Sequence, residues 1–151
     1  MNFLIRESAP GDEALILSFI KDLAVYEKML DEVVVTETLL HDQLFVKKLS
    51  CCLLAFEDEM PVGFALYFFN FSTFLGKNGL YLEDLFVRPE FRGKGYGKKL
   101  LLHLFDIAKK QHCGRMEWAV LDWNTPAIDF YKRMGAKAMD DWTVFRMQVP
   151  S

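Results

Sequence analysis

Residues Leu80–Leu102 read LYLEDLFVRPEFRGKGYGKKLLL, and this stretch predicts a strand, a glycine-rich loop and a helix in direct succession. The segment Tyr81–Val87 is aromatic or aliphatic except for two adjacent acids, and Pro89 ends it by removing a backbone donor. From Gly97 onward, apolar residues recur at helical spacing and lysines lie off that stripe. The stretch therefore predicts one strand–loop–helix unit of an α/β fold.

The loop between strand and helix, Arg92–Gly97 or RGKGYG, contains three glycines that let main-chain N–H groups converge on one point. The helix that follows adds its unpaired first-turn donors and the positive end of its dipole. Basic residues crowd the same positions: Arg88, Arg92, Lys94, Lys98 and Lys99. We therefore predict that the loop binds the phosphate groups of a ligand.

Two common phosphate-binding motifs do not fit this loop. A Walker loop needs G-x-x-x-x-G-K followed by Ser or Thr, but Gly97-Lys98 is followed by Lys99 and position 92 is arginine. The dinucleotide fingerprint G-x-G-x-x-G needs glycine at position 98 or 100, and neither position has one. The loop does fit R-x-x-G-x-G at Arg92, Gly95 and Gly97, and here the sequence resembles the GCN5-related N-acetyltransferase (GNAT) family.

A second segment, Asp122–Ala136 or DWNTPAIDFYKRMGA, resembles the N-x-x-A-x-x-F-Y-x-x-x-G-A pattern of the same family. The resemblance implies that the loop binds the pyrophosphate of acetyl-CoA, that Asn124 contacts its pantetheine arm and that Tyr131 lies beside its sulfur. It also implies CoA as a product. The cofactor-binding residues expected on this basis are Leu85, Phe86, Val87, Arg92, Gly93, Lys94, Gly95, Tyr96, Gly97, Lys98, Asn124, Pro126, Ala127 and Tyr131.

Acetylation of an amine requires a general base and a general acid. An aliphatic amine has a pKa near ~10.4, so it must lose a proton before it can attack a thioester. Glu83 can accept that proton directly or through water, provided that burial raises its pKa. Tyr131 can protonate the departing thiolate, and an amide near Leu85–Val87 can stabilise the developing oxyanion. Glu83 and Asp84 point to opposite faces of a strand, and which of them is the main base stays open.

Within the family, the chain resembles the diamine, or spermidine/spermine, N-acetyltransferase group over nearly its whole length. The segments that carry this likeness are Leu23–Glu27 (LAVYE), Gly63–Tyr67 (GFALY), Tyr81–Asp84 (YLED) and Trp123–Ala136. The likeness implies that the acceptor amine is bound by Tyr26, Glu27, Glu83 and Asp84. Ser72 stands in the loop after the third strand, where polyamine-specific members carry an acid, and the segment after Gly135 also diverges, with Asp140-Asp141-Trp142 as an acidic substitute. The expected acceptor is therefore a small primary amine: polyamine, diamine, thialysine or similar.

Two other function classes stay open. A protein or peptide N-acetyltransferase is one, since acids outnumber bases in residues 1–42 and basic charge is concentrated after Arg88. A non-catalytic acyl-CoA-binding module is the other. Nucleic acid is a poor partner for this acidic chain, whose net charge is -3 and whose basic cluster is assigned to the phosphate loop.

Length and composition favour one domain over residues 1–151, because 52% hydrophobic content supports a substantial core. The family resemblance implies that this is an N-acetyltransferase domain. No apolar run has the length of a membrane span, and the start MNFLIRESAPGDE lacks a secretory pattern, so we expect a cytoplasmic protein without a membrane partner. The three cysteines do not suggest a disulfide framework, and no histidine or cysteine spacing suggests a metal site. The family resemblance implies a homodimer.

The order of elements predicts an α/β sandwich: a mixed, mostly antiparallel central sheet with helices on both faces and a binding crevice where neighbouring strands separate. The predicted strands are Phe3–Glu7, Cys51–Phe56, Val62–Phe71, Tyr81–Val87, Met116–Leu121 and Val144–Val149. The predicted helices run from Asp12 to about Lys28, from Glu37 to about Val46 after a Thr36 cap, from Gly97 to a stop at Gly114, and over Pro126–Met134 after a Thr125 cap. Turns are expected at Glu57–Pro61 and Gly76–Gly79.

Overall fold

A five-stranded sheet is the framework of the computed structural model, which describes residues 1–150. The strands are β1 (Phe3–Glu7), β2 (Cys51–Glu57), β3 (Met60–Ser72), β4 (Lys77–Val87) and β5 (Arg115–Glu117). Strands β1 to β4 pair antiparallel in sequence order, and β5 pairs with β4 in parallel. The sheet is therefore mixed and mostly antiparallel, as the sequence predicted.

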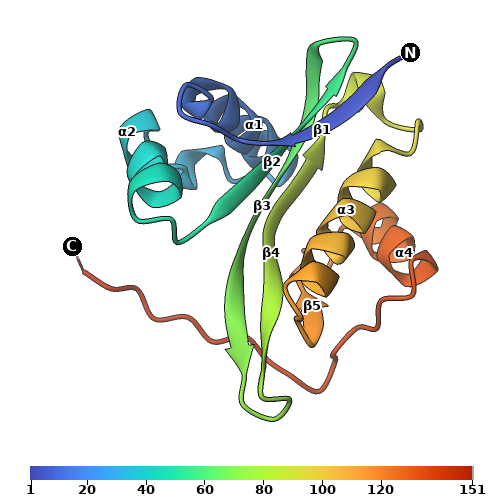
Figure 1. Cartoon of the computed structure of the whole chain (residues 1–151). Helices are drawn as coiled ribbons and strands as arrows, with labels where there is room; N and C mark the ends of the chain where they lie inside the picture. Colours follow the sequence, from blue (N-terminus) through green and yellow to red (C-terminus); the bar gives the residue numbers. More distant parts are fainter. Residues whose placement is uncertain (151) are drawn as a thin grey trace. The chain divides into compact units, whose positions relative to one another are not determined.

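The α-helices of the described residues are α1 (Glu13–Tyr26), α2 (Glu37–His41), α3 (Tyr96–Lys110) and α4 (Thr125–Arg133). A π-helix, Asp42–Val46, continues α2 to the end predicted for it. The chain divides into two compact units, Met1–Ala119 and the part from Val120 onward, and α4 lies in the second. Within the first unit, α1 and α2 cover one face of the sheet and α3 covers the other (Figure 1), which confirms helices on both faces. Among the described residues, none of the helices combines the length and apolarity needed to cross a bilayer.

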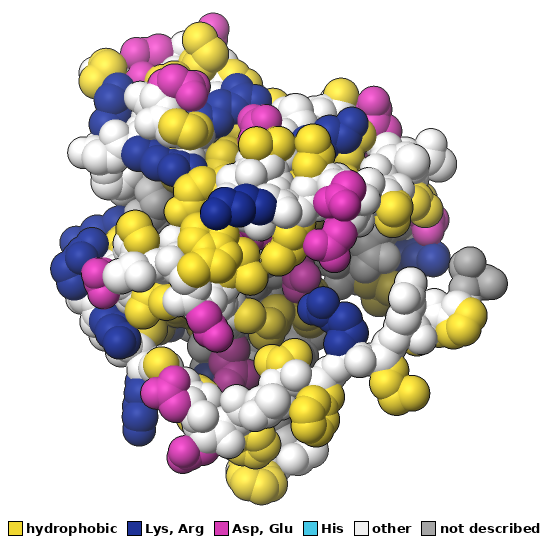
Figure 2. All heavy atoms as spheres, turned by 180° about the vertical axis from the view of Figure 1, so that it is seen from behind, with side chains coloured by type: hydrophobic (Ala, Val, Ile, Leu, Met, Phe, Trp, Pro, Cys, Tyr) yellow, Lys and Arg dark blue, Asp and Glu magenta, His cyan; other side chains and the backbone are white. Residues whose placement is uncertain are grey.

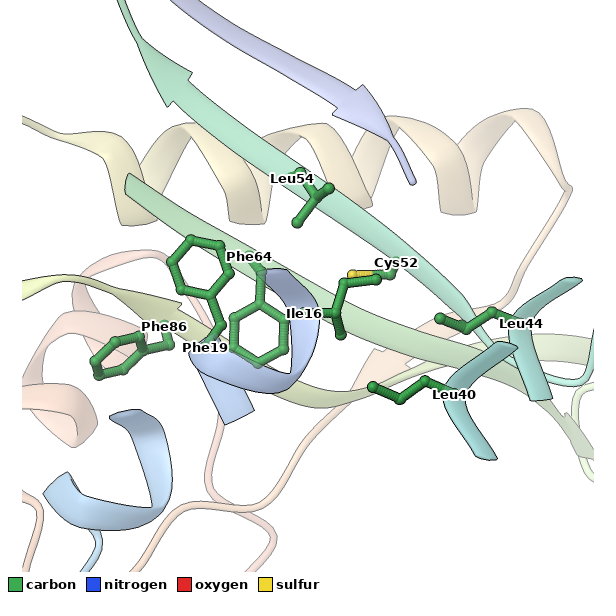
Figure 3. Packing of buried hydrophobic residues seen from close by; sticks show 8 residues of the cluster. All are labelled: Ile16, Phe19, Leu40, Leu44, Cys52, Leu54, Phe64 and Phe86. Carbon is green, nitrogen blue, oxygen red and sulfur yellow. The ribbon is translucent and has the colours of Figure 1, made fainter. Parts of the chain in front are cut away.

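The main core lies between α1, α2 and the sheet (Figure 3). Phe19 of α1 stacks on Phe64 of β3 with ring centroids 5.3 Å apart, and both side chains are fully buried. Burying a side chain of this size stabilises the fold by about 1.5–3 kcal/mol. The other members of the cluster are Ile16, Leu40, Leu44, Cys52, Leu54 and Phe86. This core fixes the C-terminal end of α1 beside β4.

Local signals placed several element ends correctly. The side chain of Thr36 accepts a hydrogen bond from the Leu39 N–H at 3.2 Å, which confirms the predicted cap of α2. Gly135 adopts φ +93° directly after α4 and confirms the predicted stop there. The cap of α4 was wrong by one residue, because Asn124 and not Thr125 holds the N-cap position.

Three predicted turns or stops differ from the structure. The β2–β3 turn needs only Asp58 and Glu59, which both adopt positive φ as in a two-residue hairpin. Gly79 lies inside β4, because a turn that includes Gly76 at φ +65° already reverses the chain. Helix α3 ends at Lys110, and His112 at φ +57° takes the left-handed conformation that was expected of Gly114.

Two predicted strands were too long or wrong. β5 spans Arg115–Glu117 and does not continue to Leu121, because its pairing with β4 ends at Tyr81. Residues 144–149 form no strand, since nothing in the described part of the chain pairs with them, and Phe145 is 93% exposed. Figure 2 shows hydrophobic side chains standing at the surface along this extended C-terminal segment. Apolar and polar residues alternate from Phe145 to Val149, but a strand also needs a partner.

Candidate functional site

β4 is interrupted by a β-bulge at Glu83. The register pairs Leu66 of β3 with Asp84 and Tyr67 with Leu82, so Glu83 is an extra residue without a partner in this ladder. Glu83 is exposed, whereas Asp84 is partly buried, so the burial that the sequence analysis expected of Glu83 is found at Asp84. The two adjacent acids therefore lie in different environments, at a point where β4 departs from regular pairing with β3.

The edge of β4 opens immediately beside this bulge. β5 pairs with β4 only from Gly79 to Tyr81, so within residues 1–150 no strand covers that edge from Leu82 to Val87. The main-chain groups of Leu85–Val87 include donors and acceptors that a sheet would otherwise use. An extended ligand with amide groups can bind to such an edge.

Acidic side chains gather beside this strand. Burial, followed by the charges of Glu83 and Glu27, raises the pKa of Asp84 to about 7. Burial also raises the pKa of Glu27, which follows the last residue of α1. The neighbouring Tyr26 ring lies 5.0 Å from the Arg92 guanidinium in the glycine loop. The structure thus brings together all four residues that the sequence assigned to the acceptor.

The acid cluster predicts an unusual pH dependence of stability. Because Asp84 has a pKa of about 7 in the folded chain and about 3.9 when unfolded, the folded state binds more protons between these values. Its contribution to the free energy of unfolding therefore falls as pH rises from about 4 to 7. Asp84→Asn is expected to be more stable than wild type by roughly 1–2 kcal/mol at pH 8, after allowance for partial exposure. Urea unfolding at pH 4.5 and pH 8 measures this, and an equal difference at both pH values would contradict it.

The glycine loop ends at the N-terminus of α3. Gly93 and Gly95 both adopt φ +82°, and Gly95 is the N-cap of the helix without any side-chain cap. The first-turn N–H groups of α3 therefore have no acceptor in the helix. A side-chain atom added at Gly93 or Gly95 would meet nothing within 4 Å, so the backbone faces open space. These features fit a pyrophosphate group.

Most of the basic side chains around the loop are held by the protein itself. Arg88 lies 3.5 Å from Asp22, the Arg92 Nε donates to the Val87 carbonyl at 2.9 Å, Lys94 lies 2.8 Å from Glu57, and Lys99 lies 5.0 Å from the Phe3 ring. Lys98 has no such partner in the part of the chain that the structure describes. Main-chain donors and Lys98 are therefore the groups best placed to meet an anion.

Gly95→Val is expected to weaken acetyl-CoA binding about tenfold. The reason is backbone strain, since a β-branched residue rarely adopts φ +82°. Steric crowding is not the reason, because no atom lies within 4 Å of a side-chain carbon added at Gly95. Isothermal titration calorimetry measures the affinity. Gly76→Val imposes similar strain at the β3–β4 turn and serves as the control. Equal affinity in the Gly95 and Gly76 variants would contradict a role for the loop.

The second unit holds the remaining predicted residues on α4. Asn124 is buried, and its side-chain oxygen accepts from the Ala127 N–H at 3.4 Å. Asn124, Ala127 and Tyr131 follow one another at spacings of three and four, so they share a face of the helix. Tyr131 is partly buried, with its ring 5.5 Å from that of Phe130. Asn124 thus has a capping role in addition to the role that its sequence motif predicts.

Sequence reasoning missed Glu57, whose carboxylate accepts hydrogen bonds from Lys94 and Tyr96 of the glycine loop. The partners are 37 and 39 residues away along the chain. No local pattern reports a contact at that separation. The one available signal was an acid at the end of an otherwise apolar strand.

Comparisons relate the chain to known proteins. The model of the Acetyltransferase (GNAT) family matches residues 19–136. The thialysine N-epsilon-acetyltransferase of Bos taurus is 39% identical over 157 residues, covering 96% of this chain and 92% of that protein. The spermidine/spermine N(1)-acetyltransferase-like protein 1 of Homo sapiens is 36% identical, covering 95% of this chain and 22% of that protein. An integron cassette protein from the mobile metagenome of V. cholerae superposes with a TM-score of 0.81 at 28% identity, covering 99% and 94% of the two chains.

Proposed function

The chain belongs to the acetyltransferase (GNAT) family and is an acetyl-CoA-dependent N-acetyltransferase, and from this premise we propose that it acetylates the primary amine of a small cationic acceptor. The observation that carries the proposal is the acid cluster of Glu27, Glu83 and Asp84 on and beside the strand that leads into the glycine loop. Negative charge there attracts an ammonium group. The relatives named for thialysine and for spermidine/spermine support an acceptor of this class.

In this proposal, three segments of the chain bind different parts of the donor. The loop Gly93–Lys98 holds the pyrophosphate, the β4 edge at Leu85–Val87 lies along the pantetheine arm, and the α4 residues Asn124, Pro126 and Ala127 bind the same arm. When bound, acetyl-CoA supplies the acetyl thioester. The first-turn donors of α3 and Lys98 provide the charge complement for the phosphates.

The proposed reaction is a direct attack without a covalent enzyme intermediate. Glu83 takes a proton from the acceptor ammonium, directly or through water, and the freed amine nitrogen forms a bond to the acetyl carbon. A main-chain N–H of the β4 edge stabilises the negative charge on the carbonyl oxygen. With acetyl-CoA bound, the carbon–sulfur bond would then break as Tyr131 donates its hydroxyl proton to the departing sulfur. The nitrogen would release its second surplus proton to solvent, and solvent would return a proton to Tyr131. Asp84, with a pKa of about 7, is the second candidate for the base.

The acceptor is expected to be short. Ser72 is buried at the end of β3, and its hydroxyl oxygen accepts from the Leu75 N–H at 3.2 Å. Ser72 bonds to the backbone of the β3–β4 turn and has no carboxylate that could bind the second, distant ammonium group of a long polyamine. This supports a compact amine such as thialysine or a short diamine, with longer polyamines as further candidates.

We also propose that the two units form one acetyltransferase domain, which the family match across residues 19–136 supports. We propose in addition a cytoplasmic homodimer, in which the C-terminal segment is covered. Trp142 and Phe145 in that segment are 76% and 93% exposed, and apolar side chains of this size gain from burial. Sedimentation equilibrium tests the dimer.

A thiol-release assay with a panel of acceptors tests the function. Thialysine, lysine, ornithine, putrescine, spermidine and spermine are compared with lysine-containing and free-N-terminal peptides. We expect catalytic efficiency at least tenfold higher with one of the small amines than with any peptide. Preference for peptides would favour a protein acetyltransferase. Acetyl-CoA binding without turnover on any acceptor would favour a binding module.

A further inference from the structure

Glu57 links the end of β2 to the glycine loop. Its side chain is almost fully buried, accepts a hydrogen bond from the Tyr96 hydroxyl, and lies 2.8 Å from the Lys94 Nζ. These two bonds hold the pKa of Glu57 below its ordinary range, so the group is a carboxylate at neutral pH. In turn, the pKa of Tyr96 is raised to about 12, which keeps its hydroxyl protonated as the donor. Glu57 therefore keeps both its hydrogen bond from Tyr96 and its ion pair with Lys94 at neutral pH.

Further contacts hold Tyr96 against the sheet. Its ring stacks on Phe3 of β1, with centroids 4.1 Å apart and planes 11° apart. The Lys99 ammonium lies 5.0 Å from the Phe3 ring and 5.8 Å from the Tyr96 ring. Tyr96 is only 6% exposed. Contacts from β1 and β2 therefore fix the side chain of Tyr96, the first residue of α3.

The two residues that bond to Glu57, Lys94 and Tyr96, lie next to the loop glycines, whose backbone has no side chain of its own to hold it. Lys94 lies between Gly93 and Gly95, and Tyr96 comes directly after Gly95. Both glycines are exposed at positive φ and have no side chain that can pack. Glycine segments lose the most conformational freedom on ordering, so contacts from the adjacent side chains decide how well the loop is ordered.

We propose that Glu57 is a positioning residue that holds the glycine loop in its anion-binding conformation through Tyr96 and Lys94. The inference rests on the proposed use of this loop for the pyrophosphate of acetyl-CoA. Glu57 acts before the ligand arrives, and it has no part in proton transfer to or from the acceptor. It therefore affects donor affinity and not the chemical step.

Removal of Glu57 has two opposing effects. It frees the Lys94 ammonium, which can then approach a phosphate, and a partly exposed ion pair of this kind is worth a factor of about two to five in affinity. It also releases the loop, and ordering the backbone of even one residue costs about tenfold in affinity. Since Gly93, Lys94 and Gly95 are all released, the net result is weaker binding.

The test measures acetyl-CoA affinity by calorimetry and KM and kcat by thiol release at 15 °C. Glu57→Ala is expected to raise the Kd and KM for acetyl-CoA about tenfold, with kcat and the KM for the amine within twofold of wild type. Tyr96→Phe is expected to raise the Kd about fivefold. The double variant is expected to match Glu57→Ala within twofold, because both changes break one link. Glu57→Gln, which keeps an acceptor oxygen for Tyr96, is expected to recover much of the affinity.

Glu90→Gln is the matched control, since Glu90 is an exposed acid that lies four residues before Lys94 and the structure shows no side-chain partner for it within residues 1–150. Unchanged affinity in both Glu57→Ala and Tyr96→Phe would overturn the inference, as would a loss confined to kcat. If Glu57→Ala does not fold, Tyr96→Phe and Lys94→Met decide by the same criterion. Failure of the wild-type protein to bind acetyl-CoA would instead overturn the proposed function.

Discussion

Replacement of Tyr131 by phenylalanine is expected to lower kcat about 100-fold or more while the Kd for acetyl-CoA stays within about twofold. The substitution removes one hydroxyl and keeps the ring, so packing against Phe130 on α4 is preserved. Without a proton donor, the departing sulfur must leave as a thiolate or take its proton from water. Because this deficit arises only in the transition state, ground-state binding is not affected.

Stopped assays of CoA release measure kcat, and calorimetry measures the affinity. Tyr67→Phe is a suitable control, because it removes a buried hydroxyl from β3 and leaves α4 unchanged. We expect its kcat within about twofold of wild type. A Tyr131→Phe variant with wild-type turnover would remove Tyr131 from the mechanism, and a parallel loss of acetyl-CoA affinity would assign it to binding.

The sequence predicted those parts of the fold that depend on neighbouring residues. β1 was predicted with the bounds that the structure shows, and the strand–loop–helix unit from β4 to α3 was found from its apolar periodicity and its glycines. Each of these signals lies within about 20 residues of chain. The C-terminal strand failed because pairing needs a partner far away in sequence, and an alternating pattern does not identify one.

The same division applies to the candidate site. The sequence named Glu83 and Asp84 as acids in different environments, but it did not show the bulge at Glu83, which is a property of the register between β3 and β4. It also counted five basic residues around the loop as available to a ligand. The structure commits Arg88, Arg92 and Lys94 to partners within the protein, and a count of charges could not show this.

The acid cluster also illustrates how a site can cost stability. Two partly buried carboxyl groups, Glu27 and Asp84, have raised pKa values because the fold places them out of water, and the charges of Glu83 and Glu27 raise the pKa of Asp84 further. A sequence optimised only for stability would not keep this arrangement. Its retention is understandable if a cationic acceptor neutralises the cluster on binding. Binding of the amine should then also raise the temperature of unfolding.

Glu83→Gln is expected to lower kcat/KM for the amine about 100-fold at pH 7, because the acceptor then reaches the thioester only in its rare unprotonated form. The deficit should shrink steadily toward pH 9–10, since the free amine becomes more abundant as pH approaches its pKa near ~10.4.

The pH profile also separates the two candidate bases, Glu83 and Asp84. If Asp84 were the base, Asp84→Asn would abolish a limb of the wild-type profile that falls below pH 7, where the Asp84 carboxyl takes up its proton. Glu83→Gln would then keep that limb and most of its activity. We expect the opposite: Asp84→Asn raises the KM for the amine several-fold through lost attraction, and its kcat/KM does not recover with rising pH. A Glu83→Gln variant with a wild-type profile would transfer the role of base to Asp84.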